Sequence, residues 1–208
     1  SPVVALHDAW FPPERCVKLA HRFGNWFTGT TLIYHRDTLL AVGGFDPAYG
    51  APADLFTALA VASLRGATYS PEPFAAIRIH AGSYSSRDLS DIAGLDMRLE
   101  QLRARGPRLS PRLFSGKFLE RTASRFRFAA IRVSRGGLIP DVAVREGGWK
   151  GAALRVADQL IPASLRTVRV AVAFLILRPF DILPTLYYRL LGWAVVRLRV
   201  HLRGRGSL

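Results

Sequence analysis

A double-glycine turn constrains this chain more than any other feature, because it ends one helix and leads directly into another. The turn occupies residues 43–46 and reads Gly-Gly-Phe-Asp. Glycine tolerates the left-handed backbone conformation that often follows a helix, so Gly43 is expected to terminate a short helix. Pro52 then suits the first turn of the next helix, and Asp54 places a carboxylate in that turn.

The pattern of apolar residues predicts the elements around this turn. Apolar residues at helical spacing predict helices over residues 12–23, 52–65 and 93–105. A short helix is also predicted over 37–42, where Asp37 can act as the cap, and an arginine-rich helix over 117–135. Residues 26–35 are rich in β-branched and aromatic side chains, and residues 74–79 form a short apolar run, so both are predicted to be strands. The order strand, helix, helix, strand predicts an α/β architecture for the first part of the chain.

Glycine and proline mark two predicted irregular connections in the second part of the chain. One covers residues 106–116, which contain Pro, Gly and Ser, and the other lies between the glycine pairs at 136–137 and 147–148.

Charge divides the chain into two parts. Residues 1–92 hold 7 Lys and Arg against 8 Asp and Glu, whereas residues 93–208 hold 22 against 7. Such an asymmetry indicates an anionic partner for the second part. We therefore predict two domains, 1–92 and 93–208, the second being a basic and mainly helical extension. Nucleic acid is not expected as the partner, because the sequence shows no nucleic-acid-binding motif and its tail is apolar.

The tail of the chain predicts helices at a membrane surface near residues 165–203. Its longest unbroken apolar run, Val170–Leu177, is far shorter than the roughly 20 residues that a membrane-spanning helix needs. Arginines interrupt and follow the apolar segments, as in helices that lie on anionic lipid. The protein is thus expected to be cytoplasmic and peripheral on the inner face of the cell membrane. A buried helical hairpin is the alternative.

Three further residues accompany Asp54 as candidates for chemistry. Arg78 and His80 lie two apart in a predicted strand and therefore project from the same face, where Arg suits a diphosphate and His suits a divalent metal. Ser83 follows in a polar loop. Each feature alone also has a structural explanation, since Asp54 could simply stabilise its helix and Arg78 and His80 could simply face solvent.

Taken in order, these motifs resemble the family-2 glycosyltransferases of the GT-A fold. The resemblance covers roughly residues 24–90 and rests on the Gly-Thr-Thr-Leu-Ile-Tyr-His-Arg-Asp segment at 29–37, the turn at 43–46, and Arg78-Ile79-His80 with Ser83. It implies a partial GT-A, Rossmann-like domain followed by the basic extension.

The resemblance also implies roles for particular residues. Asp54 takes the position of the catalytic base, while Ala53 replaces the Glu usual in the family. His80 would contact a divalent metal ion, Mn or Mg. The substrate would be bound by Gly43, Gly44, Phe45, Asp46, Arg78 and Ser83.

The activity so implied is inverting transfer of a sugar from a nucleotide-diphosphate donor to an acceptor hydroxyl. The acceptor would be a glycan or a lipid-linked glycan in the synthesis of an envelope polysaccharide or glycolipid. The sequence has no Asp-x-Asp motif and opens on Ser1, so we expect the donor-binding half to be missing and this fragment to be inactive alone. The alternative function is a non-catalytic membrane-surface or scaffold module.

Overall fold

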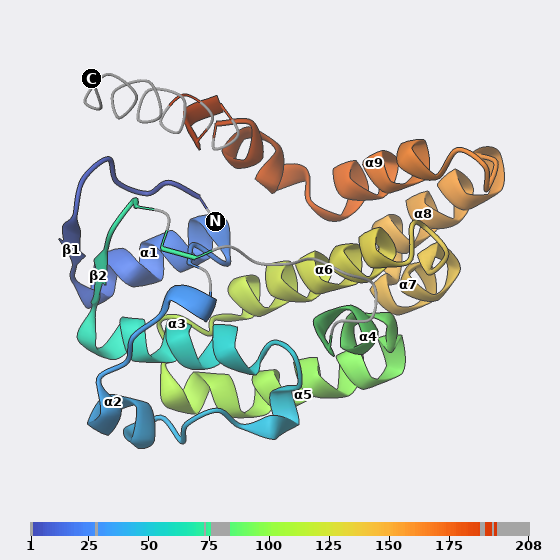
Figure 1. Ribbon diagram of the computed structural model, residues 1–208. Coiled ribbons are helices and arrows are strands. Elements are labelled where there is room, and N and C mark those ends of the chain that lie inside the picture. Colours follow the sequence, from blue (N-terminus) through green and yellow to red (C-terminus); the bar gives the residue numbers. More distant parts are fainter. Residues whose placement is uncertain are drawn as a thin grey trace.

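The computed structural model describes residues 2–27, 29–72, 74–75, 84–187, 190–192 and 194, and it consists mainly of helices (Figure 1). The first part of the chain forms β1 (Ala9–Phe11), α1 (Pro13–Phe23), η1 (Gly29–Thr31), α2 (Arg36–Ala41), η2 (Pro47–Tyr49), α3 (Ala53–Arg65) and β2 (Ala67–Tyr69). The second part forms α4 (Tyr84–Ser90), α5 (Ile92–Leu109), α6 (Gly116–Val133), α7 (Ile139–Glu146), α8 (Gly148–Leu160), α9 (Arg166–Leu177) and η3 (Pro179–Asp181).

The predicted α/β architecture is wrong for the residues that the structure describes. Their strands are β1 and β2 alone, each three residues long, paired antiparallel with Trp10 opposite Thr68. A Rossmann-like GT-A domain requires a larger, mostly parallel sheet, which these residues do not form. The described part of the basic extension, in contrast, is mainly helical as predicted.

Residues 26–35 show why the strand prediction failed. The described residues of this segment, 26–27 and 29–35, contain the single turn η1 and otherwise irregular backbone, because β1 and β2 pair with each other and not with this segment. Their aromatic residues serve packing instead, and Trp26 is buried with its ring edge-on to Phe11 at 5.9 Å between centroids. The other predicted strand, residues 74–79, lies largely outside the described residues.

Five predicted helices are confirmed as α1, α2, α3, α5 and α6, and all of them except α2 bury apolar side chains in a core. Both predicted irregular connections are partly helical. Helix α5 continues through Pro107 to Leu109, and α7 with the start of α8 occupies the stretch between Gly136 and Gly148. Gly147 has φ 62° and separates these two helices without ending helical structure altogether.

Two hydrophobic cores lie along the length of α5 and α6. The first joins β1, α1 and α3 to the end of α5, and its largest members include Phe11, Trp26, Phe56, Leu102, Phe114 and Phe118. The second joins the start of α5 to α6, α7, α8 and α9, and includes Leu95, Leu99, Phe128, Ile131, Val142, Leu154 and Leu177. The predicted junction at residue 92 coincides with the start of α5, whose side chains enter both cores.

In the described part of the chain, no single helix is both long enough and apolar enough to cross a bilayer. Helix α9 and the segment Pro179–Gly192 meet that criterion only when taken together, and they are bent by 95° at their junction.

Candidate functional site

Asp54 lies in the first turn of α3, with its side chain exposed. One carboxylate oxygen accepts the backbone N–H of Leu55 at 2.6 Å. No Arg or Lys within the described ranges forms an ion pair with it. Asp54 is therefore a solvent-accessible carboxylate with no cationic partner in the described part of the chain.

The segment containing Gly29 and Tyr34 packs beside this carboxylate. A Cβ atom added at Gly29 would collide with the second oxygen of Asp54, so glycine is what allows the close approach. Burial raises the pKa of the Tyr34 hydroxyl to about 12, and the negative charge of Asp54 adds to the effect. The Tyr34 ring in turn meets Phe45 edge-on, with 5.4 Å between the centroids. Tyr34 thus links the turn at 43–46 to Asp54.

The double glycine has the geometry that the sequence predicts. Gly43 and Gly44 have φ values of 88° and 69°, and their N–H groups donate to carbonyls of α2. The carbonyl of Gly44 accepts the hydroxyl of Thr57 at 2.9 Å, which attaches the turn to α3. The turn therefore fixes the position of α2 relative to the helix that carries Asp54.

Asp46, predicted to contact substrate, is engaged in holding the turn. One carboxylate oxygen accepts the N–H of Ala48 at 2.9 Å at the start of η2, and the other pairs with Arg105 of α5. The pair with Arg105 joins this loop to a helix about sixty positions later in the chain. With both oxygens occupied, Asp46 has less capacity than Asp54 to accept a proton or a hydroxyl group.

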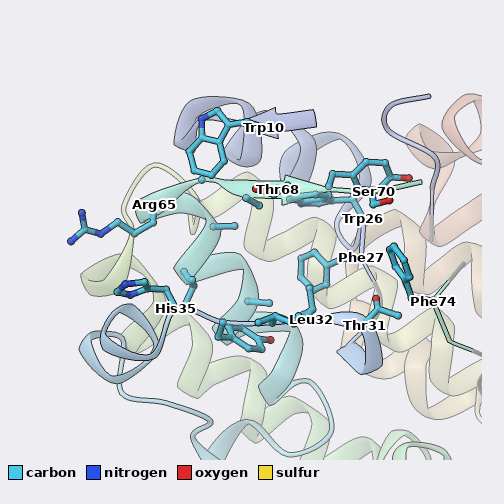
Figure 2. Close-up of a pocket in the computed structure, with 18 of the residues that line it drawn as sticks. Trp10, Trp26, Phe27, Thr31, Leu32, His35, Arg65, Thr68, Ser70 and Phe74 are labelled. Atoms are coloured by element: carbon cyan, nitrogen blue, oxygen red, sulfur yellow. The ribbon is translucent and has the colours of Figure 1, made fainter. Parts of the chain in front are cut away.

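A pocket of about 1200 Å³ lies beside the Tyr34 segment, between the two-stranded sheet and the end of α3 (Figure 2). Its aromatic lining comes from Trp10, Trp26, Phe27, Tyr34, Tyr69 and Phe74. Figure 2 shows Arg65 and His35 at one end of the view and Phe74 at the other. The pocket combines apolar walls with a few polar groups, as small-molecule sites commonly do.

Sequence analysis did not predict this pocket, because its walls come from four separate segments of the chain. The aromatic richness of residues 26–34 was the available signal, but it indicates a strand as readily as a pocket wall. Only the pairing of β1 with β2 brings Trp10 and Tyr69 to the same place.

The remaining predicted site residues, Arg78, His80 and Ser83, lie outside the described residues. Within the described ranges, no three His, Cys, Asp or Glu side chains are grouped so that they could hold a metal ion. The divalent metal therefore remains a prediction from the resemblance, and no step of chemistry is assigned to it.

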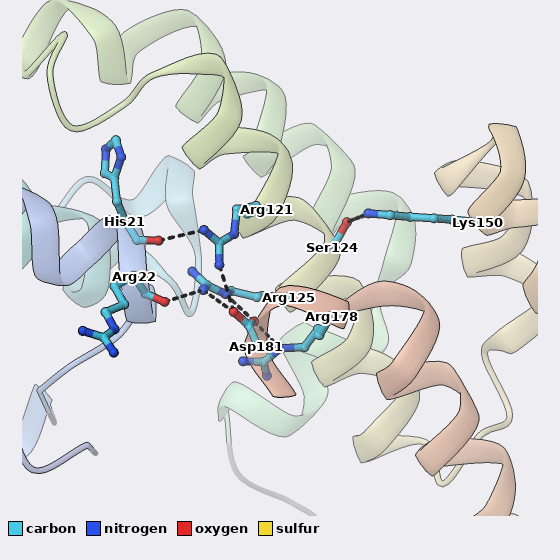
Figure 3. A network of polar contacts seen from close by, with 8 residues as sticks. All are labelled: His21, Arg22, Arg121, Ser124, Arg125, Lys150, Arg178 and Asp181. Atoms are coloured by element: carbon cyan, nitrogen blue, oxygen red, sulfur yellow. Dashed lines mark hydrogen bonds and ion pairs between the residues drawn. The ribbon is translucent and has the colours of Figure 1, made fainter. Parts of the chain in front are cut away.

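A second polar cluster surrounds the buried carboxylate of Asp181 in η3 (Figure 3). Its oxygens accept hydrogen bonds from Arg121 at 3.1 Å, from Arg125 at 2.7 and 2.9 Å, and from Arg178 at 2.7 Å. Burial alone would raise the pKa of Asp181, but the hydrogen bonds and charges of Arg125 and Arg178 outweigh it and lower the pKa to about 2. Asp181 is accordingly ionised and fully used in structural contacts.

The same arginines connect this cluster to the end of α1. Arg121 donates to the carbonyl of His21 at 3.1 Å, and Arg125 donates to the carbonyl of Arg22 at 3.4 Å. The cluster was not predicted from the sequence, although Asp181 is the only acidic residue after position 158 and stands among many arginines. Its role is to fasten η3 and α6 to α1.

Comparison of the chain with protein-family models, with curated proteins and with solved structures gave no match.

Proposed function

We propose that this chain supplies the acceptor side of a glycosyltransferase site, with Asp54 as the general base. The observation that carries the proposal is the exposed carboxylate at the start of α3, which has no cationic partner among the described residues. A base for hydroxyl deprotonation must be ionised and accessible, and Asp54 meets both requirements. The order of motifs from Gly29 to Asp54, which resembles the acceptor-side region of family-2 glycosyltransferases, supports the same assignment.

In the proposed reaction, Asp54 removes the proton from an acceptor hydroxyl as its oxygen attacks the anomeric carbon of a nucleotide-diphosphate sugar. A bond forms between the acceptor oxygen and the anomeric carbon. The bond from that carbon to the diphosphate oxygen breaks, and the nucleoside diphosphate leaves with the electron pair. The configuration inverts, and Asp54 later returns its proton to water.

The aromatic pocket supports binding of the acceptor beside this base. Tyr34 and Thr31 line the pocket, and Asp54 lies against the same segment of chain. Aromatic side chains offer large, rigid apolar faces, which suit the apolar faces of sugar rings or part of a lipid carrier. A glycan or lipid-linked glycan is therefore the acceptor class that we propose.

The experiment is a transfer assay with a panel of nucleotide sugars and with glycan and lipid-linked acceptors. It is run on this chain and on any longer natural protein that contains it, with the product identified by mass spectrometry. Asp54→Asn should lower transfer by about 10²- to 10⁴-fold, because the amide cannot accept the proton. Nucleotide-sugar binding should be unaffected.

Asp37→Asn is the matched control, because Asp37 is also an exposed Asp in the first turn of a helix, α2. It should transfer at the wild-type rate. Wild-type transfer by Asp54→Asn would remove the base assignment. Absence of transfer from every protein tested would favour the non-catalytic scaffold instead.

A further inference from the structure

Exposed apolar side chains are concentrated in α9 and the segment that follows it. We call this set the outer ridge. It comprises Leu165, Val168, Leu175, Phe180, Leu183, Leu186 and Leu190, whose exposed fractions lie between 45% and 79%. Isolated exposed apolar residues are normal on a protein surface, but a concentration of this kind in one segment marks an interaction site.

The ridge is a distinct face of α9, opposite to the face that enters the core. Val168 and Leu175 are exposed and lie about two helical turns apart, so they share one side of the helix. Ala173 and Leu177 point to the other side, where they are buried in the second core. In Figure 1, α9 lies on the opposite side of α6 from α5, at the outer surface. Val168 and Leu175 therefore face away from the second core.

A bend at the end of α9 divides the ridge into two short segments. Helix α9 and the segment Pro179–Gly192 differ in direction by 95°. Asp181 lies at the bend, where its contacts with Arg121, Arg125 and Arg178 fix the backbone. Phe180 and Leu183, the two most exposed members of the ridge, flank Asp181. A fixed bend with apolar side chains at its apex suits shallow insertion into an interface.

Positive charge accompanies this apolar surface. Arg155 of α8 and Arg166 at the start of α9 are exposed, and neither forms an ion pair with a residue that the structure describes. By sequence, Arg197, Arg199, Arg203 and Arg205 follow the ridge, beyond the described residues. An apolar face bordered by arginines is the pattern of helices that lie on anionic lipid.

We propose that the outer ridge docks this protein on an anionic lipid bilayer, with the apex around Phe180 and Leu183 inserted among the headgroups. The charge favours this occupant over a second copy of the chain, because residues 93–208 carry 22 basic against 7 acidic residues and two such surfaces repel each other. The docking does not depend on the proposed sugar transfer, since the ridge shares no residue with the Asp54 region.

The test is flotation of the full chain with vesicles of phosphatidylcholine, with and without phosphatidylglycerol, at low and high salt. Binding should require phosphatidylglycerol and weaken at high salt. Leu183→Asp should reduce the partition coefficient by about tenfold or more, because one inserted leucine is lost. Met97→Asp introduces the same charge at a similarly exposed position on α5 and should bind as the wild type does.

A fluorescent reporter distinguishes insertion of the ridge from general electrostatic attraction. The native thiol of Cys16 is buried, and burial raises its pKa to about 11, so it should not react with a label. A polarity-sensitive dye on Leu183→Cys should shift to the blue with anionic vesicles, whereas the dye on Met97→Cys should not. Circular dichroism checks that each variant is folded.

Three outcomes would overturn the proposal. The first is no binding of the wild-type chain to anionic vesicles, and the second is equal binding by Leu183→Asp and wild type. The third is a wild-type dimer in solution that Leu183→Asp converts to a monomer, which would assign the ridge to a second copy of the chain.

Discussion

The region around Asp54, at the start of α3, and the region around Asp181, in η3, hold a carboxylate in opposite ways. Asp54 is exposed and has no cationic partner among the described residues, whereas Asp181 is buried beneath three arginines. A buried carboxylate is retained because paired charges compensate its lost hydration. An exposed carboxylate without an ion pair keeps its hydration and is not needed to compensate buried charges. We therefore expect the stability of the folded protein to depend on Asp181, and Asp54 to be available for chemistry.

The largest effect on stability is expected from removing the carboxylate of Asp181. Asp181→Ala leaves the charges of Arg121, Arg125 and Arg178 uncompensated near one another, so the free energy of unfolding should fall by about 3 kcal/mol. Urea denaturation measures this loss. Asp141→Ala, which removes an exposed carboxylate from the first turn of α7, should change the value by less than about 1 kcal/mol. Equal losses in the two variants would contradict the comparison.

The ion pairs of Asp181 also predict how the stability of the protein depends on pH. The pKa of Asp181 is lowered to about 2 in the folded protein, below its ordinary value of 3.8. Its contribution is therefore complete above about pH 4 and is lost as the pH falls towards 2, amounting to about 2 kcal/mol. Unfolding free energies measured across that range should decline less steeply for Asp181→Asn than for wild type. An identical decline would show that Asp181 is not responsible.

Two glycines, one beside each carboxylate region, are expected to differ in the same way when they are replaced by alanine. Gly24 has φ 72° at the end of α1, and a Cβ atom there would collide with the guanidinium of Arg125, so Gly24→Ala should cost about 1–3 kcal/mol. Gly29→Ala places its Cβ only against the flexible carboxylate of Asp54 and should cost less than about 1 kcal/mol. It should nevertheless lower transfer, because the carboxylate must move. Thermal unfolding and the transfer assay separate these effects.

The smallest effect is expected at Tyr34. Burial and the charge of Asp54 together raise its pKa to about 12, so Asp54→Asn should lower that pKa by the smaller, electrostatic part and leave the part due to burial. Carbon-13 NMR of labelled tyrosine, titrated at high pH, measures the change. An unchanged pKa would show that Asp54 does not act on Tyr34, and would weaken its proposed place beside the pocket.

Local patterns predicted the helices that lie on each side of the candidate site, but not how distant segments meet. The end of α2 and the start of α3 followed from Gly43 and Pro52, because glycine and proline act on the adjacent backbone alone. Whether residues 26–35 become a strand depends on a partner, and the structure pairs β1 with β2 instead. The aromatic pocket and the Asp181 cluster likewise join segments far apart in the sequence, so no short pattern indicates them.

The contrast between the two carboxylates is tested most directly by measuring transfer and unfolding on the same Asp54→Asn protein. Transfer should fall by about 10²- to 10⁴-fold, while the free energy of unfolding should change by less than about 1 kcal/mol, the size of a helix-dipole interaction. Retained transfer, or a loss of stability as large as that of Asp181→Ala, would show that Asp54 is a structural residue and would contradict its assignment as the base.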